Sequence, residues 1–119
     1  MSRNLPYNRA DRIAQQIYQV AASFIYEDTD DERLIGIQIT RAAMTNDLSI
    51  ARIYFYLDGG KDKQEAAKHA LEAKRSGLKH KIGQELLLKI MPRIDFFLDE
   101  GVENAERIEE ILKNLKSEV

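Results

Sequence analysis

Basic side chains are concentrated in the centre of this chain, where a group of ammonium and guanidinium ions could bind the phosphates of a nucleic acid. Residues 61–93 hold nine Lys or Arg and four Asp or Glu, although the 119-residue chain has a net charge of −2. This asymmetry predicts one cationic face that meets an anionic partner. The candidate phosphate-binding residues are Lys74, Arg75, Ser76, Gly77, Lys79 and Lys81, with Arg9, Arg12 and Arg41 at the edges of that surface.

The central cations and a pair of tyrosines each have an ordinary structural explanation as well as a functional one. The central cations equally suit a solvated helical hairpin, in which the lysines only keep the surface soluble. Tyr54 and Tyr56 stand beside Arg52 on one face of a predicted strand, a pattern found in base-stacking platforms of sheet-type RNA-binding proteins. Exposed tyrosines are also common because aromatic residues favour strands. The sequence leaves both alternatives open.

Catalytic and metal-binding patterns are absent from the sequence. The chain has no cysteine, which excludes disulfides and thiolate zinc sites. His69 and His80 lack the i, i+4 partner of a zinc-binding helix, and the turn at 58–61 lacks the spacing of a phosphate-binding loop. The acidic run at 27–32 lacks the regular ligand spacing of a calcium loop. We therefore expect a protein that is not an enzyme and that holds no metal or cofactor.

The elements that must position the cations follow from hydrophobic periodicity. Steps of three and four residues predict helices, and strict alternation predicts half-buried strands. The resulting order is helix, strand, strand, helix, helix, strand, helix, which indicates an α+β domain with helices packed on a three-stranded sheet. The predicted helices are 9–26, 66–76, 78–90 and 105–115, and the predicted strands are 34–40, 48–57 and 94–98.

A break between the two central helices is predicted at Ser76-Gly77. Separate apolar stripes run from Ala66 to Leu71 and from Leu78 to Ile90, and glycine permits the backbone to turn between them. The helix axis should therefore change direction within a residue or two of this dipeptide. The residues expected to be buried are Ile13, Ile17, Phe24, Ile37, Ile39, Ile53, Phe55, Leu71, Ile82, Leu86 and Phe96.

The last predicted helix carries an apolar stripe from Ala105 to Leu115, and its other positions are largely acidic. We expect the stripe to cover hydrophobic surface. The length suits one domain over 1–119, with a core at about 9–112. No stretch resembles a signal peptide or approaches the roughly 18 apolar residues of a membrane helix. These features predict a cytoplasmic protein away from membranes, and we expect it to be a monomer.

Several short motifs occur in the order and spacing of a known family. They are Asp31-Glu32-Arg33-Leu34, Ile39-Thr40, Asn46-Asp47-Leu48, Ala51-Arg52-Ile53-Tyr54, Arg75-Ser76-Gly77, and Pro92-Arg93-Ile94-Asp95-Phe96 with Asp99 after it. From about Arg9 to Leu112 the chain resembles ribosome-binding factor A, a bacterial small-subunit maturation factor with a KH-like fold. In that family an Ala-x-Gly kink replaces the GxxG loop of KH domains. Here Glu32 stands where the family has proline, and Lys74 or Arg75 stands where it has the kink alanine.

The resemblance implies a KH-like domain of type II, the type that begins with an additional helix. It also implies a factor that binds the immature 30S ribosomal subunit through its 16S rRNA during late maturation, near the 5′ end and the neck of that rRNA. A ribosome-associated GTPase would release the factor. The alternative is a protein-interaction module of the same fold, which uses the acidic terminal helix and binds no RNA.

Overall fold

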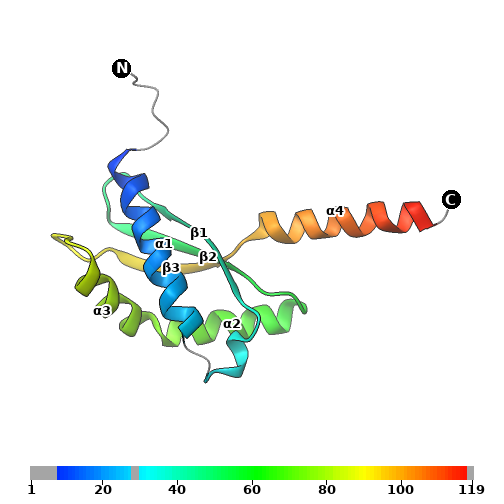
Figure 1. Cartoon of the computed structure of the whole chain (residues 1–119), viewed down its shortest axis with the longest axis horizontal. Helices are drawn as coiled ribbons and strands as arrows, with labels where there is room; N and C mark the ends of the chain where they lie inside the picture. Colours follow the sequence, from blue (N-terminus) through cyan, green and yellow to red (C-terminus); the bar gives the residue numbers. More distant parts are fainter. Residues whose placement is uncertain (1–7, 28–29, 118–119) are drawn as a thin grey trace, which may run out of the picture.

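The computed structural model describes residues 8–27 and 30–117, which form α-helices, one 3₁₀-helix and a three-stranded sheet (Figure 1). The predicted order of helices and strands is confirmed. Residues 1–7 and 118–119, the ends of the expected domain, lie outside the described residues. The elements are α1 (Arg9–Glu27), η1 (Glu32–Leu34), β1 (Gln38–Met44), β2 (Ile50–Tyr56), α2 (Lys61–Ala73), α3 (Arg75–Glu85), β3 (Arg93–Leu98) and α4 (Glu100–Ser117).

The first strand begins at Gln38 rather than at Leu34, where the alternating pattern starts. The Asp31 carboxylate accepts a hydrogen bond from the backbone N–H of Arg33 at 3.0 Å and caps η1. Gly36 then adopts a φ of +82°, which redirects the chain into the strand. The alternation before Gln38 therefore belongs to a capped turn, whose buried residue is Leu34.

The strands lie in the order β1-β2-β3. β1 and β2 are antiparallel, as expected from their closeness in sequence, whereas β2 and β3 are parallel. A parallel pair needs a crossover connection, and α2 and α3 supply it. The register sets Ile53 opposite Phe96 and Tyr54 opposite Phe97. Because side chains alternate along a strand, these two rows point to opposite faces of the sheet.

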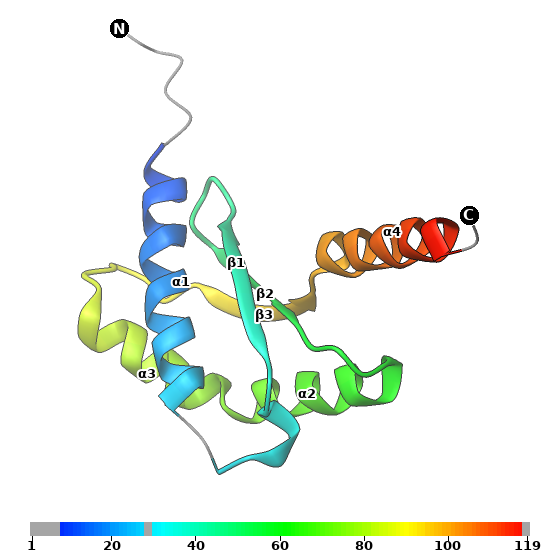
Figure 2. The same ribbon diagram turned by 45° about the vertical axis from the view of Figure 1, so that its right-hand side comes forward.

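One face of the sheet forms the core under the helices, with α1 crossing it (Figures 1 and 2). Every residue of the predicted core is buried except Phe24 and Leu86, which are half-buried and pack against its margin. Leu86 is less buried than expected because α3 ends at Glu85 and Leu86 is already extended. Ile90, which was expected to continue the same stripe, is 81% exposed.

The predicted break between the central helices is confirmed and lies at Lys74, within two residues of Ser76-Gly77. Lys74 has φ −96° and ψ 2°, which separates α2 from α3, and the two helices lie at an angle (Figure 1). Gly77 is helical and lies inside α3. A Cβ at Gly77 would approach Cζ of Phe24 in α1 to 2.9 Å. Glycine at this position therefore allows the Phe24 ring to lie close to α3 and does not itself form the hinge.

We expect Gly77→Ala to destabilise the protein by about 1 to 2 kcal/mol. A new Cβ would clash with the Phe24 ring, and that strain outweighs the gain of about 1 kcal/mol in helix propensity. In a Phe24→Leu background the clash is relieved, so the same substitution should be neutral or stabilising. Urea unfolding of the four proteins of this double-mutant cycle measures the coupling. Equal effects of Gly77→Ala in both backgrounds would contradict the packing role.

Helix α4 extends away from the sheet, which contradicts the expectation that its apolar stripe covers hydrophobic surface (Figures 1 and 2). Glu106 accepts a hydrogen bond from the Tyr56 hydroxyl at 2.6 Å, and Glu103 accepts one from Gln64 at 3.2 Å. These bonds turn acidic positions of α4 toward the body of the protein, which leaves the apolar stripe outside. Its exposed members, each more than half exposed, are Ile108, Ile111, Leu112 and Leu115.

Candidate nucleic-acid interface

A groove runs between the helix pair α2–α3 and the free edge of β3, and four cations line it. We call it the β3 groove. Its volume is about 400 Å³, and within the described sheet β3 pairs with β2 on one side only. Two acidic side chains, Glu72 and Asp95, also line the groove, so the cations are in excess. The cations are Lys68, Arg75, Lys79 and Arg93.

Arg75 is the most constrained of these cations. It begins α3 and is half-buried, and its guanidinium carbon lies 5.8 Å from the centroid of the Phe96 ring, within the range of a cation–π contact. Among the described residues, its Nε is the one buried side-chain nitrogen or oxygen without a hydrogen-bond partner. A buried donor without a partner is costly, and an acceptor such as a phosphate oxygen would satisfy it.

The structure divides the cations that were expected on one surface. Arg75 and Lys79 are four residues apart in one helix and therefore share a face, which is the face toward the groove. Lys81 points to a different side, where it forms an ion pair with Glu85 at 3.1 Å. Lys74, at the helix junction, lies beside the acidic loop that contains Asp31. The expected cluster of four cations is thus reduced to Arg75 and Lys79.

The other predicted site residues lie at several places. Ser76 and Gly77 are exposed in the first turn of α3, and Arg9 and Arg12 are exposed at the start of α1. Arg41, on β1, lies over the Tyr54 ring and 3.4 Å from the carboxylate of Asp99. None of these five residues lines the β3 groove.

Two groove residues, Lys68 and Arg93, were missed as candidates. A signal for Lys68 is present in the sequence, because Lys68, Glu72, Arg75 and Lys79 are spaced by four, three and four residues, which describes one helical face. Arg93 starts β3 and forms an ion pair with Asp95 at 3.1 Å. Its position depends on the parallel pairing of β3, which no local pattern in the sequence specifies.

The acidic motif before β1 has a structural role. Arg33 donates two side-chain hydrogen bonds to Asp31, at 3.0 and 2.7 Å. The hydrogen bond from Arg33 holds the pKa of Asp31 at about 2, well below the ordinary value. The pair therefore stabilises the turn in its charged form and has no geometry for acid–base chemistry.

Asp99 joins three elements at the end of β3. Its carboxylate accepts hydrogen bonds from the Thr40 hydroxyl at 2.6 Å and from the backbone N–H of Gly101 at 3.1 Å. The first bond reaches β1, and the second caps the start of α4. The hydrogen bond from Thr40, helped by the nearby Arg41 guanidinium, lowers the pKa of the Asp99 carboxyl. Asp99 is only 7% exposed and thus serves the fold rather than a partner.

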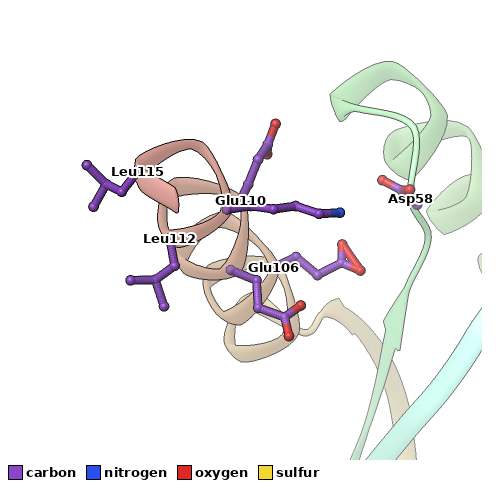
Figure 3. A pocket seen from close by; sticks show the side chains of 7 residues that line it. Asp58, Glu106, Glu110, Leu112 and Leu115 are labelled. Atoms are coloured by element: carbon purple, nitrogen blue, oxygen red, sulfur yellow. The ribbon is translucent and has the colours of Figure 1, made fainter. Parts of the chain in front are cut away.

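A hollow with a volume of about 1000 Å³ lies between α4 and the turn after β2 (Figure 3). Asp58, Glu106 and Glu110 line it, and Leu112 and Leu115 point to the side of α4 away from Asp58 (Figure 3). Among the described residues, no group of three or more His, Asp or Glu side chains is placed to hold a metal ion. Because carboxylates line this hollow, the cationic β3 groove is the better candidate for binding an anion.

No described helix has the length and apolar character needed to span a bilayer.

Comparison of the sequence with known proteins gives the same family in each case. The family model described as ribosome-binding factor A matches residues 9–112. A ribosome-binding factor A from Hydrogenovibrio crunogenus is 36% identical over 112 residues, which cover 92% of this chain and 93% of that protein. Another from Desulfatibacillum aliphaticivorans is 34% identical, with 90% and 87% covered.

Solved structures of this kind share the fold. The crystal structure of ribosome-binding factor A from Thermus thermophilus matches with a TM-score of 0.66 at 20% identity, covering 77% of this chain and 97% of that one. A homology model of the Thermus thermophilus factor, fitted into the cryo-electron microscopy map of a 30S complex, matches with a TM-score of 0.62 at 20% identity, covering 76% and 93%. The fold is KH-like, and the chain belongs to the ribosome-binding factor A family.

Proposed function

We propose that this protein binds the 30S ribosomal subunit through its 16S rRNA, as a non-enzymatic factor in late maturation of the subunit. The observation that carries the proposal is the β3 groove, which is lined by Lys68, Arg75 and Lys79 from the helices and by Arg93 from the strand. Membership of the family supplies the partner. On this proposal the protein acts as a monomer in the cytoplasm, near the 5′ end and neck of the rRNA, until a ribosome-associated GTPase releases it.

The physical basis of the proposed contact is the charge distribution. The chain has a net charge of −2, so binding to RNA requires its cations to be gathered on one face. A phosphate backbone in the β3 groove would meet Arg75 and Lys79 in the first turns of α3, at the positively polarised end of the helix. Neutralised phosphates release counterions, and the affinity should therefore fall steeply with salt.

A matched pair of variants tests the groove. Arg75→Ala/Lys79→Ala should weaken sedimentation with purified 30S particles on the order of tenfold and lower the slope of log K against log salt by roughly 1.4 to 1.8. Lys74→Ala/Lys81→Ala removes the same charge from positions outside the groove and should have a much smaller effect. Sedimentation over a range of salt concentrations measures both quantities, and 70S particles serve as a second target. Equal losses for the two variants would contradict the groove assignment.

A second candidate function rests on α4, whose apolar stripe is exposed and whose other positions, Glu103, Glu106, Glu109 and Glu110, are acidic. The stripe fits a protein with an apolar groove, and such binding would need no RNA. The same sedimentation experiment separates the two functions. If the α4 surface alone attaches the protein to the subunit, neither pair of lysine and arginine substitutions changes the salt slope.

A further inference from the structure

An aromatic row with cations at both ends crosses the sheet face opposite the core. The register sets Arg41, Tyr54 and Phe97 side by side on the three strands. The Arg41 guanidinium carbon lies 3.7 Å from the centroid of the Tyr54 ring, and the Tyr54 and Phe97 centroids are 5.9 Å apart. The Lys68 ammonium of α2 lies 5.9 Å from the Phe97 centroid and completes the row. We call these four residues the aromatic row.

The aromatic row is continuous with the β3 groove. Phe97 and Lys68 belong to the row and also line the groove. Phe97 is 38% exposed, so part of its surface is accessible beside the groove that it lines. Tyr56, which was expected on the same platform, is 6% exposed and bonded to Glu106. Because Glu106 belongs to α4, this hydrogen bond shows that α4 covers Tyr56 and closes this end of the face. The same bond raises the pKa of the Tyr56 phenol to about 12.

We propose that the aromatic row binds unstacked bases of a single-stranded RNA segment whose phosphates lie in the β3 groove. This inference rests on the proposed function and adds the form of RNA that is recognised. Aromatic rings and arginine planes both stack on bases. Because the Arg41 guanidinium lies over the Tyr54 ring, the surfaces that the row offers to bases are the plane of Arg41 and the ring of Phe97. A base stacked on Phe97 stands next to the groove cations, so one nucleotide reaches both surfaces.

Charge and base accessibility select single-stranded RNA as the partner. The bases in a duplex are covered by their neighbours on both faces, so a duplex offers the row no ring to stack on. Asp99 forms an ion pair with Arg41 at 3.4 Å, and Asp95 forms one with Arg93 at 3.1 Å, so these charges offset each other near the row. The positive charge that favours a polyanion is therefore that of Lys68 and of the cations Arg75 and Lys79, which line the groove beside Phe97.

The test compares two substitutions of the exposed ring in the full-length protein. Phe97→Leu keeps an apolar side chain but removes the ring, and Phe97→Tyr keeps the ring. The first should weaken binding of a short single-stranded oligoadenylate at least about fivefold with an unchanged salt slope, and the second should bind as the parent does. Binding of the same oligoadenylate paired with oligouridylate should be unaffected by either substitution. Thermal unfolding of each variant verifies that the fold is retained.

Fluorescence gives a direct readout of stacking because the chain has no tryptophan. In Phe97→Trp, the introduced indole is the one reporter, and oligoadenylate should quench it on binding. Leu87→Trp places the same reporter at a fully exposed loop position, where quenching should be weak. Equal quenching in the two proteins would overturn the inference.

Failure of the aromatic-row inference can be distinguished from failure of the proposed function. The inference is overturned, and the proposed function stands, if Phe97→Leu binds oligoadenylate and 30S particles like the parent while Arg75→Ala/Lys79→Ala binds both weakly. If the groove variant also binds 30S particles like the parent, the proposed function fails. Loss of single-stranded binding in Phe97→Leu, with recovery in Phe97→Tyr, supports the row as a base-stacking site.

Discussion

Replacing Leu78 by alanine is expected to lower the free energy of unfolding by about 2 to 5 kcal/mol. Leu78 is fully buried in α3, and it packs in the core that joins α1, α3 and the sheet. Truncation removes buried apolar surface and leaves a cavity that its neighbours fill only in part. Denaturant unfolding monitored by circular dichroism measures the loss.

Leu78 also affects the β3 groove, because it anchors the helix that carries two of the groove cations. Arg75 and Lys79 lie on the same helix, and the packing of Leu78 fixes the position of that helix against the sheet. Leu87→Ala is the matched control, because Leu87 is fully exposed in the loop after α3 and its truncation should change the stability by less than about 0.5 kcal/mol. Similar losses for the two leucines would show that α3 is not anchored as described.

Replacing Asp99 by alanine is the second substitution with a large expected effect. It should lower the free energy of unfolding by about 2 to 4 kcal/mol. The change removes the partner of the Thr40 hydroxyl and the cap of α4 together. Because α4 extends from the body with its apolar stripe exposed, it receives little support from packing, and helices of this length are marginal by themselves. We therefore expect a loss of helicity at 222 nm as well as a lower unfolding midpoint.

From the Asp99 carboxylate we also predict that the stability of the protein depends on pH. The pKa of Asp99 is lower in the folded protein than its ordinary value, so its charge contributes stability that is complete above the unfolded value of about 3.9. That contribution is lost as the pH falls through the folded pKa. Asp99→Asn retains the cap but not the charge, and its difference in stability from the parent should shrink as the pH falls below about 4. A difference that stays constant down to strongly acidic pH would contradict this role of the carboxylate.

Much of the fold could be predicted from the sequence because its signals are local. A period of 3.6 or 2 residues depends on which side chains share a face, and it identified every α-helix and every strand of the described residues and most of the predicted core. Periodicity placed the start of a strand wrongly where a turn has the same alternation of apolar and polar residues. The alternation around Ile35 begins inside a capped turn, and Asp31 and Gly36 decide where the strand starts.

The candidate interface was predicted only in part, because a cluster of cations in the sequence does not specify a face. Arg75 and Lys79 share a helix face, whereas Lys81, six residues beyond Arg75, points elsewhere and pairs with Glu85. Lys68 was identifiable from helical spacing across the break, but Arg93 enters the groove through the pairing of β3 with β2.

By itself, then, the sequence determined the order of the α-helices and strands, most members of the core and the concentration of cations in the central helices, since each follows from residue types and short-range spacing. The tertiary structure alone decided that the helices separate at Lys74, while the close approach of Phe24 assigns Gly77 to packing. It also decided that α4 points outward, because Glu103 and Glu106 bond to Gln64 and Tyr56 from other elements. Such contacts join residues that are distant in the chain, and local periodicity carries no information about them.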